Sequence, residues 1–381
     1  MSGSNINKKI AIVLPSLVGG GAEKLAIYLA NYWNDEGFNV TFVLVKKYGK
    51  LMSMVNPEID IIDLKTEKLR SSFFTLRSHF KNNSYDVIWS GLWPLTSISI
   101  LAWIFSGQKS RIFVIDHNHL SISTVKQLKF PKYLLRIILK ITYPLATGII
   151  AVSDGVKKDI CMLGWLNSRL VETIYNPAYT GRVDNYILTD KIKTELWGNG
   201  SDKHIISVGS LKPQKNHKLL IKAFSMLENT NSKLIILGEG ELESELNDLI
   251  NKLNLSKRVF LKGFVVDPTL WYLSADLFVL SSNWEGLPTV LIEALECGLP
   301  IVSTNCPSGP DEILENGNYG KLVPMNNVNA LSDAIKLSLM EAPHDPSPLT
   351  KRAKDFTIPN ISRKYLEYFK LIDKKAGEAS D

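Results

Sequence analysis

Cysteine is scarce in this chain of 381 residues. Its three cysteines include no CxxC pair, so the sequence supports neither a disulfide framework nor a zinc cluster. So few cysteines fit a reducing cytosol. A secretory signal is also lacking, because Met1–Lys9 is polar and the apolar run Ile10–Val18 ends in glycines instead of a cleavage site. The cysteines are Cys161, Cys297 and Cys306.

Charge of either sign is modest, since 44 Lys and Arg oppose 38 Asp and Glu, for a net charge of +6. Basic residues do not cluster with aromatic ones, which argues against a nucleic-acid-binding protein. The two halves differ. Residues 1–200 carry 24 basic and 15 acidic residues, a net charge of +9, whereas residues 201–381 carry 20 and 23, a net charge of −3. We therefore expect the first half to meet an anionic partner.

Long hydrophobic runs are few, and one of them requires a decision. Val87–Gln108 has no charged residue and is long enough to cross a bilayer as a helix. It contains several Ser, Thr, Gly and Pro residues, however. We interpret it as a buried strand at Asp86–Trp89 followed by a helix at Leu95–Phe105.

What the chain does contain is an alternation of short apolar, β-branched runs with amphipathic stretches, typical of parallel βαβ units. A polar, irregular stretch at Asn176–Gly200 interrupts the pattern, and we expect a linker there. The fold class is therefore α/β, with two doubly wound domains at about residues 1–180 and 181–359. A last amphipathic helix is expected at about Asn360–Lys374. The expected strands are Lys9–Leu14, Val40–Val45, Asp86–Trp89, Arg111–Ile115, Gly148–Val152, Glu172–Ile174, His204–Val208, Leu234–Leu237, Val259–Leu261, Leu277–Leu280, Pro300–Thr304 and Leu322–Val323.

Glycines follow the first expected strand, in the stretch Pro15–Glu23, before a helix at about Gly21–Glu36. Glycines let the backbone approach a ligand, and the first turn of a helix offers N–H groups to an anion. The spacing is not GxGxxG, so the dinucleotide fingerprint is absent. A tight strand-to-helix turn without a ligand is the alternative.

A second loop, Val208–His217, joins a strand to a helix at about Asn216–Leu227 and holds Lys215 at the helix start. The helix dipole disfavours a cation there unless an anion is also bound. Lys215 is thus a candidate for pairing with a phosphate, and a solvated surface lysine is the alternative.

The strongest pattern is Ser281–Ala294, in which seven residues separate Glu285 from Glu293. We expect Glu285 on a glycine turn and Glu293 two turns into the next helix, on the face of Thr289. The turn's N–H groups could hold a diphosphate while the carboxylates accept sugar and ribose hydroxyls. A capped helix with incidental acidic residues is the alternative.

These stretches together resemble the retaining glycosyltransferases of family 4. The resemblance extends from about Lys9 to Val323 and includes a further stretch at Cys306–Ile313. It implies the GT-B fold, in which two Rossmann-like domains face a central cleft and the C-terminal helix, about residues 360–381, crosses back to the first domain. The sequences that carry it are KIAIVLP followed by GGAE, VGSLxPQKN, LGEGEL and EGLPTVLIEA.

The resemblance also implies roles for individual residues. Glu285 would contact the hydroxyls of the donor sugar, Glu293 the nucleotide ribose, and Lys215 the diphosphate leaving group. His117, after the strand Arg111–Ile115, matches the family's histidine beside the reacting sugar. Many members have arginine where Ser210 stands, so leaving-group stabilisation here depends more on Lys215. The other expected donor-binding residues are Gly20, Gly21, Leu287, Thr289 and Val290.

The stretch Asp116–His119 also invites interpretation as a metal site, but no third ligand stands at a helpful spacing. The resemblance implies a reaction without a divalent ion, and no cofactor is expected. Catalysis then depends on electrostatic support of the departing diphosphate and needs no protein nucleophile. The resemblance implies that the acceptor hydroxyl attacks from the face that the diphosphate leaves. His119 is left without a role.

Five basic residues recur at steps of three or four between Lys126 and Lys140, among many apolar ones. On one helix they would form a basic row beside an apolar face, as in a helix on an anionic membrane. Relatives that extend lipid-linked oligosaccharides have a basic segment at this place. A core helix with a solvated edge is the alternative. The five are Lys126, Lys129, Lys132, Arg136 and Lys140.

The expected function is transfer of a hexose or N-acetylhexosamine from a UDP-sugar to a lipid-linked or growing glycan, as in the synthesis of surface polysaccharides. We expect a cytoplasmic enzyme, peripheral on the inner face of the membrane. A sugar-nucleotide epimerase of the same fold and a non-catalytic glycan-binding subunit are the alternatives.

Overall fold

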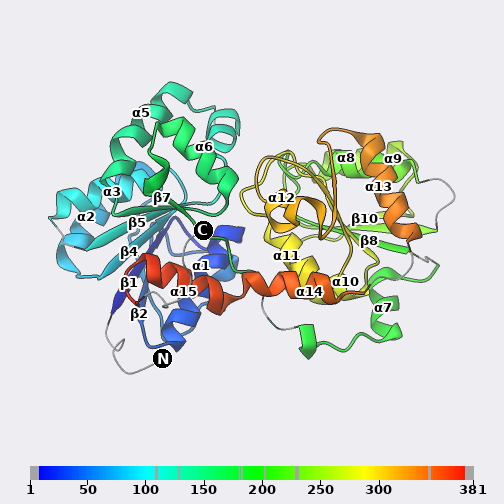
Figure 1. Cartoon of the computed structure of the whole chain (residues 1–381), viewed down its shortest axis with the longest axis horizontal. Helices are drawn as coiled ribbons and strands as arrows, with labels where there is room; N and C mark the ends of the chain where they lie inside the picture. The colour runs from blue at the N-terminus through cyan, green and yellow to red at the C-terminus, as the bar shows by residue number, and fades with distance from the viewer. Residues whose placement is uncertain are drawn as a thin grey trace. The chain divides into compact units, whose positions relative to one another are not determined.

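The structure, a computed structural model, describes residues 8–107, 110–127, 129–179, 181, 183–200, 203–227, 231–341 and 345–373. The chain divides into two compact units (Figure 1). The first unit comprises Met1–Pro177 and Ile358–Asp381, and the second comprises Ala178–Thr357. Each contains one sheet of parallel strands, as the alternating pattern predicts.

The first unit has a seven-stranded sheet in the order β3-β2-β1-β4-β5-β6-β7. Its strands are β1 (Lys9–Leu14), β2 (Asn39–Leu44), β3 (Asp60–Asp63), β4 (Val87–Gly91), β5 (Arg111–Asp116), β6 (Gly148–Ala151) and β7 (Val171–Thr173). Its α-helices are α1 (Gly21–Asp35), α2 (Ser72–Asn82), α3 (Leu95–Ser106), α4 (Leu120–Ile122), α5 (Lys132–Thr142), α6 (Asp154–Gly164) and α15 (Ile358–Tyr368).

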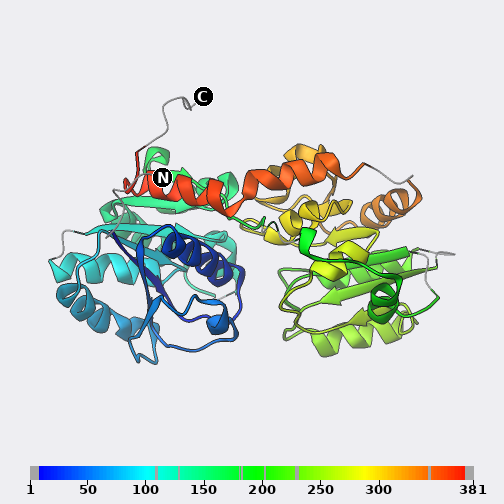
Figure 2. The same cartoon turned by 90° about the horizontal axis from the view of Figure 1, so that it is seen from below.

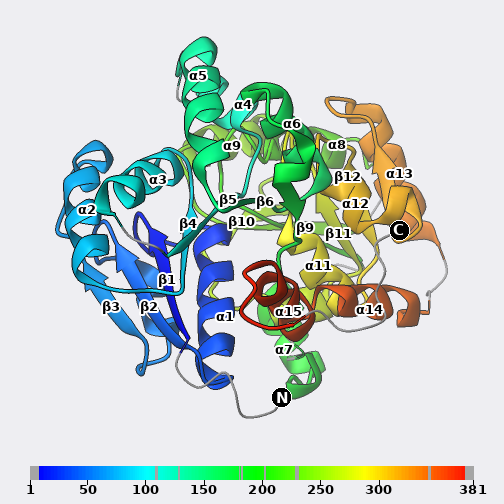
Figure 3. The same ribbon diagram turned by 60° about the vertical axis from the view of Figure 1, so that its left-hand side comes forward.

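Strand alternation decides which helices cover each face of this sheet. Successive side chains of a strand point to opposite faces. In β4, Trp89 packs edge-on against Trp33 of α1, with ring centroids 5.8 Å apart, while Ser90 donates a hydrogen bond of 2.9 Å to Ser99 of α3. Accordingly, α1 lies on one side of the sheet and α2 and α3 on the other (Figure 3).

The chain's last helix belongs to the first unit, which in Figure 2 contains both the blue N-terminal strand and the red α15. The indole N–H of Trp33 donates to the hydroxyl of Ser362 on α15 at 2.7 Å. Tyr365 and Phe369 pack edge-on against the same indole, with ring centroids 6.3 and 5.9 Å from it. A buried aromatic cluster thus fixes α15 beside α1, and the expected return of the C-terminal helix is confirmed.

The second unit has a six-stranded sheet in the order β10-β9-β8-β11-β12-β13. Its strands are β8 (Lys203–Val208), β9 (Ser232–Leu237), β10 (Val259–Leu261), β11 (Leu277–Leu280), β12 (Ile301–Thr304) and β13 (Lys321–Val323). Its α-helices are α7 (Asp190–Trp197), α8 (His217–Ser225), α9 (Glu243–Lys252), α10 (Thr269–Ser274), α11 (Thr289–Glu296), α12 (Pro310–Ile313), α13 (Val328–Met340) and α14 (Ser347–Ala353).

The expected strands omit β3, and the expected linker was not predicted to contain a helix. The strand β3 has acidic residues at both ends, which hide its short apolar centre. The expected linker contains helix α7, which Thr189 caps by accepting from the N–H of Ile192. Its last residue, Trp197, is buried, and its indole donates to Ser274 at 2.8 Å. Burial of Trp197 therefore stabilises a helix in this polar stretch.

The uncharged stretch at Val87–Gln108 forms β4 and α3, as predicted. Within the ranges that the structure describes, no helix is long and apolar enough to span a membrane.

Candidate active site

Three loops of the second unit follow neighbouring strands. The loops after β8, β11 and β12 lead into α8, α11 and α12 respectively. Because β8 pairs with β11 and β11 with β12, all parallel, the three loops meet at one edge of the sheet. This edge is where open α/β sheets bind ligands.

Glu285 lies on the loop after β11 with only 4% of its surface exposed. Its Oε1 accepts hydrogen bonds from the ammonium of Lys215 at 2.6 Å and from the hydroxyl of Ser282 at 2.5 Å. Its Oε2 accepts one from the side-chain amide of Gln214 at 3.3 Å. The buried carboxylate is thus satisfied by the protein itself, whereas the sequence suggested only polyol hydroxyls as its partners. No pattern in the sequence distinguishes Ser282 and Gln214 as its partners.

Lys215 extends across Gly209. A Cβ at Gly209 would stand 3.1 Å from three carbons of the lysine side chain, so a larger residue would displace it. The ring of the buried His217 lies 3.3 Å from the carbonyl oxygen of Gly209, and burial lowers the pKa of this histidine to about 4. A neutral imidazole therefore braces the loop beside Lys215 at neutral pH.

The loop that carries Glu285 is braced from the next strand. The hydroxyl of Ser308 donates to the carbonyl oxygens of Glu285 and Gly286 at 3.0 and 3.1 Å. Gly309 has a φ of 96°, and a Cβ there would stand 2.4 Å from Pro288. The motif at Cys306–Ile313, which the sequence left without a task, thus supports the Glu285 loop.

Glu293 lies one turn into α11, not two, because the helix begins only after Pro288. Its Oε2 accepts a hydrogen bond of 3.0 Å from the hydroxyl of Tyr272 on α10. Burial, and then the charge of Glu293, raises the pKa of Tyr272 well above its ordinary value. In the first turn, Thr289 and Val290 have N–H groups without an intrahelical acceptor, as the cradle suggested for a diphosphate requires. Leu287 is buried just before the helix.

In the first unit, the glycines after β1 have distinct surroundings. Gly20 precedes α1, and a Cβ there would stand 2.2 Å from the carboxylate of Glu23, so glycine at this position makes room for that acid. Gly21 begins the helix and would meet nothing within 4 Å. Both glycines are exposed, so the backbone is open at Gly20 and Gly21, and only Gly20 lacks room for a side chain.

His117 directly follows β5. Both of its ring nitrogens are buried and have no hydrogen-bond partner among the described residues. Burial lowers the pKa of His117 to about 4, so the ring is neutral at physiological pH. A Cβ at Gly91, the last residue of β4, would stand 3.4 Å from the His117 Nε2, so the adjacent strand end lies close beside the ring.

Asp116 points to the opposite face of β5, where its Oδ1 accepts from the hydroxyl of Tyr143 at 3.1 Å. Its Oδ2 is buried without a partner in the described chain. Burial raises the pKa of Asp116 to about 7; the Tyr143 hydrogen bond lowers it, and the charge of Asp159 raises it. His119 lies 3.6 Å from Asp159. No group of three or more metal-ligating side chains occurs in the ranges the structure describes.

The predicted single basic helix at residues 126–140 is wrong. Lys126 falls in the π-helical turn Ser123–Gln127, with its side chain outside the described residues, and Lys129 adopts a φ of 51°. Pro131 immediately precedes α5, which begins at Lys132. Proline favours the start of a helix and disfavours its interior, so the basic row is divided. Lys132, Arg136 and Lys140 alone share α5.

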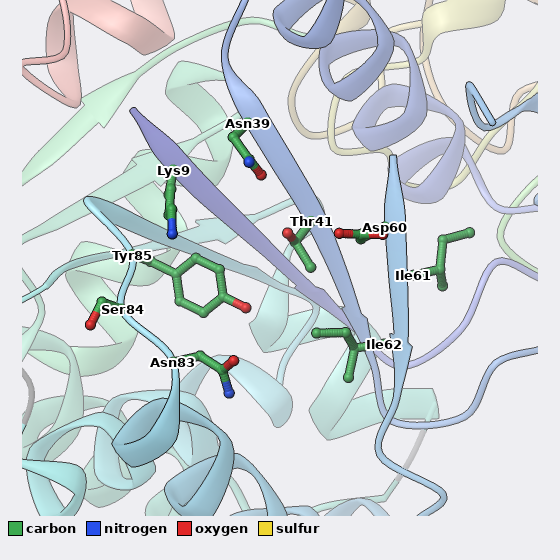
Figure 4. A pocket seen from close by; sticks show the side chains of 9 residues that line it. All are labelled: Lys9, Asn39, Thr41, Asp60, Ile61, Ile62, Asn83, Ser84 and Tyr85. Carbon is green, nitrogen blue, oxygen red and sulfur yellow. The ribbon is translucent and has the colours of Figure 1, made fainter. Parts of the chain in front are cut away.

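A hollow of about 300 Å³ lies at the amino-terminal ends of strands of the first sheet, away from their carboxyl ends (Figure 4). Lys9, Asn39 and Asp60, which line it, are the first residues of β1, β2 and β3. None of the residues predicted for the site contributes to it, since Gly20 and His117 follow the carboxyl ends of β1 and β5.

Two doubly wound parallel sheets are the architecture of the GT-B class of glycosyltransferases. Residues 19–182 match "Glycosyltransferase Family 4" and residues 189–356 match "Glycosyl transferases group 1". The chain belongs to this family and is a glycosyltransferase.

Among its relatives is the N-acetylgalactosamine-N,N'-diacetylbacillosaminyl-diphospho-undecaprenol 4-alpha-N-acetylgalactosaminyltransferase of Campylobacter jejuni. The two are 30% identical over 375 residues, which cover 95% of this chain and 99% of that protein. An amylovoran biosynthesis glycosyltransferase of Erwinia amylovora is 24% identical over 79% of this chain and 81% of its own. The structure of Anabaena HepE in complex with UDP-glucose matches with a TM-score of 0.78 and 20% identity, over 96% of this chain and 100% of that one. This last likeness concerns the fold.

Proposed function

We propose that the chain is a retaining, metal-independent glycosyltransferase that moves a hexose or N-acetylhexosamine from a UDP-sugar to a lipid-diphosphate-linked glycan. The observation that carries the proposal is the buried pair of Lys215 and Glu285 at the edge of the second sheet. The named activity of the Campylobacter relative, whose acceptor is a diphospho-undecaprenol glycan, supports the choice of acceptor.

In this proposal, the ammonium of Lys215 and the first-turn N–H groups of α11 stabilise the charge that develops on the departing diphosphate. Lys215 makes one hydrogen bond to Glu285 and keeps two further N–H groups for phosphate oxygens. Glu285 accepts a hydroxyl of the donor sugar, and Glu293 the ribose hydroxyls. Removal of one such preorganised donor lowers the reaction rate about 10²-fold to 10³-fold.

His117 would lie beside the reacting sugar. Because burial holds its pKa near 4, it would act as a neutral hydrogen-bonding group and not as a cation. The acceptor hydroxyl would attack from the face that the diphosphate leaves, and a departing phosphate oxygen would take its proton.

A panel of nucleotide-sugars tests this function. We expect release of UDP, and not of GDP, only when a lipid-diphosphate glycan is present, with the product keeping the donor's anomeric configuration by NMR. Activity should persist in EDTA. Nucleotide release without acceptor from every donor, or an inverted product, would contradict the proposal.

We propose further that α5 contacts an anionic membrane. Leu135 and Leu139 face the core, while Tyr133, Ile137 and Ile141 are 66%, 50% and 59% exposed, one turn apart. Lys132, Arg136 and Lys140 form the next row of the same helix. An exposed apolar row beside a basic row suits a helix that lies in an anionic lipid surface.

The exposed Trp165 after α6 extends this surface. The Arg136 guanidinium and the Lys140 ammonium stand 4.5 and 5.0 Å from the centre of its ring. Tryptophan favours the membrane–water interface, so this side chain would lie at the level of the lipid headgroups.

Replacement of Lys132, Arg136 and Lys140 with Gln should weaken binding of the protein to vesicles that contain anionic phospholipid. Its binding to vesicles of neutral lipid should not change. A matched control replaces three exposed lysines of the second unit, Lys222, Lys252 and Lys336. Equal losses in the two triple variants would show only a general effect of net charge, and unchanged binding in the α5 variant would refute the membrane contact.

A further inference from the structure

The two oxygens of Glu285 are used unequally. Its Oε1 already accepts from Lys215 and from Ser282, which occupies both lone pairs of that oxygen. Among the described residues its Oε2 accepts only from Gln214, at the longer distance of 3.3 Å. The remaining acceptor position of this buried carboxylate is therefore on Oε2.

Both the side chain and the main chain of Gln214 make hydrogen bonds to the loop that carries Glu285. Its side-chain amide donates to the carbonyl oxygen of Trp284 at 3.0 Å as well as to Glu285. The main-chain carbonyl oxygen of Gln214 accepts from the main-chain N–H of Asn283 at 2.8 Å. The residue belongs to the loop after β8, so it connects that loop with the one after β11 at the carboxylate itself.

We infer that Gln214 is a positioning residue that holds Glu285 Oε2 as the oxygen accepting a hydroxyl of the donor sugar. Gln214 offers Oε2 a neutral donor and adds no charge, while the charged partner, Lys215, is confined to Oε1. The carboxylate then cannot rotate to exchange its two oxygens without breaking three hydrogen bonds. This inference rests on the proposed function, because it assigns an atom to the sugar contact suggested for Glu285.

The first test compares Gln214→Met with the wild-type protein. Methionine has a similar length and cannot donate, so Oε2 would lose the one partner it has in the described part of the chain. We expect kcat/KM for the donor to fall about 10-fold to 100-fold, as for the loss of one hydrogen bond to a charged group. Affinity for UDP alone, measured by calorimetry, should stay within about twofold, because Glu285 contacts the sugar and not the nucleotide.

Gln214→Glu provides a readout that a merely structural role would not change. It keeps the shape of the side chain but places a second carboxylate at Oε2. Two carboxylates so close do not both ionise readily, so the acid limb of the kcat/KM profile should move to higher pH. Gln214→Met should show no such shift.

Lys212→Ala is the matched control, since Lys212 is exposed on the same loop and its side chain makes no interaction in the described structure. It should behave as wild type. The inference fails if Gln214→Met retains wild-type kinetics, or if it loses UDP affinity in proportion to its loss of turnover. If Gln214→Met does not fold, as judged by circular dichroism, the pH profile of Gln214→Glu decides.

These outcomes separate the inference from the function on which it rests. Wild-type protein that binds UDP-sugar and transfers it, together with unaffected Gln214 variants, overturns the inference alone. Wild-type protein that binds no UDP-sugar overturns both.

Discussion

Glu285 and Glu293 in the second unit differ from Asp116 and His117 in the first unit in how the protein satisfies their polar atoms. In the second unit, Glu285 accepts hydrogen bonds from three side chains and Glu293 accepts one from Tyr272. In the first unit, Asp116 Oδ2 and both ring nitrogens of His117 are buried without a partner in the described chain. An unsatisfied buried polar group costs about 1–3 kcal/mol.

This difference indicates two ways of preparing a site. The second unit presents side chains that are already oriented before a ligand arrives, which limits the reorganisation needed for binding. The first unit retains polar atoms that stability alone does not favour, and such departures from local consistency are expected at functional positions. We infer that a bound molecule or water completes the polar atoms of His117 and Asp116, which the described chain leaves without partners.

The largest effect should come from Glu285→Gln, which keeps the shape of the side chain and removes its charge. We expect kcat to fall by about 10³ and the free energy of unfolding by about 3 kcal/mol, because Lys215 is left buried without its counter-charge. UDP release and urea denaturation measure the two.

The double variant Glu285→Gln with Lys215→Met should recover part of this stability and none of the activity. If it is no more stable than Glu285→Gln alone, the buried charge of Lys215 is not the cause of the loss.

His117→Leu should separate activity from stability in the first unit. The ring nitrogens have no partner to lose among the described residues, so we expect the free energy of unfolding to stay constant or rise. Activity should fall about 100-fold. A stability loss as large as that of Glu285→Gln would remove the distinction between the two units.

Much of this arrangement could be predicted from the sequence, because it depends on local patterns. The β-branched runs gave most of the strands, and the turn before Thr289 placed Glu285 on a loop. Since neighbouring parallel strands end at one edge, Lys215 and Glu285 could be expected near each other even though they stand 70 positions apart in the chain.

The partners of those residues could not be predicted in the same way. Tyr272 reaches Glu293 from a short helix on which no motif stands, and the hydrogen bond of Gln214 depends on how two loops cross. By contrast, the division of the basic segment had a local signal in Pro131, which the three- and four-residue spacing of the lysines concealed.

Asp116 makes the stability of the first unit depend on pH. Its pKa rises from an unfolded value of about 4 to about 7 in the folded protein, so the folded state binds more protons between these values. Stability should therefore fall as the pH rises from about 4 to 7, by on the order of a few kcal/mol, and level off above.

Asp116→Asn removes this titration. As the pH rises from about 4 to 7, the variant should become more stable relative to the wild-type protein. Urea denaturation at several pH values measures the two free energies of unfolding. A difference that stays constant with pH would show that Asp116 is ionised throughout.

The smallest effect should follow Tyr272→Phe, which removes the hydroxyl that donates to Glu293 and leaves the ring in place. We expect the Kd for UDP to rise roughly threefold to tenfold, because a hydrogen bond to a charged group contributes about 1.5–3 kcal/mol and part of that is regained from water. Tyr365→Phe is the matched control, since the Tyr365 hydroxyl is also buried but has no partner in the described chain. It should leave UDP affinity unchanged and should not lower the free energy of unfolding. Equal effects of the two substitutions on UDP affinity would mean that Tyr272 does not orient Glu293, and the second unit would then be less preorganised than its hydrogen bonds indicate.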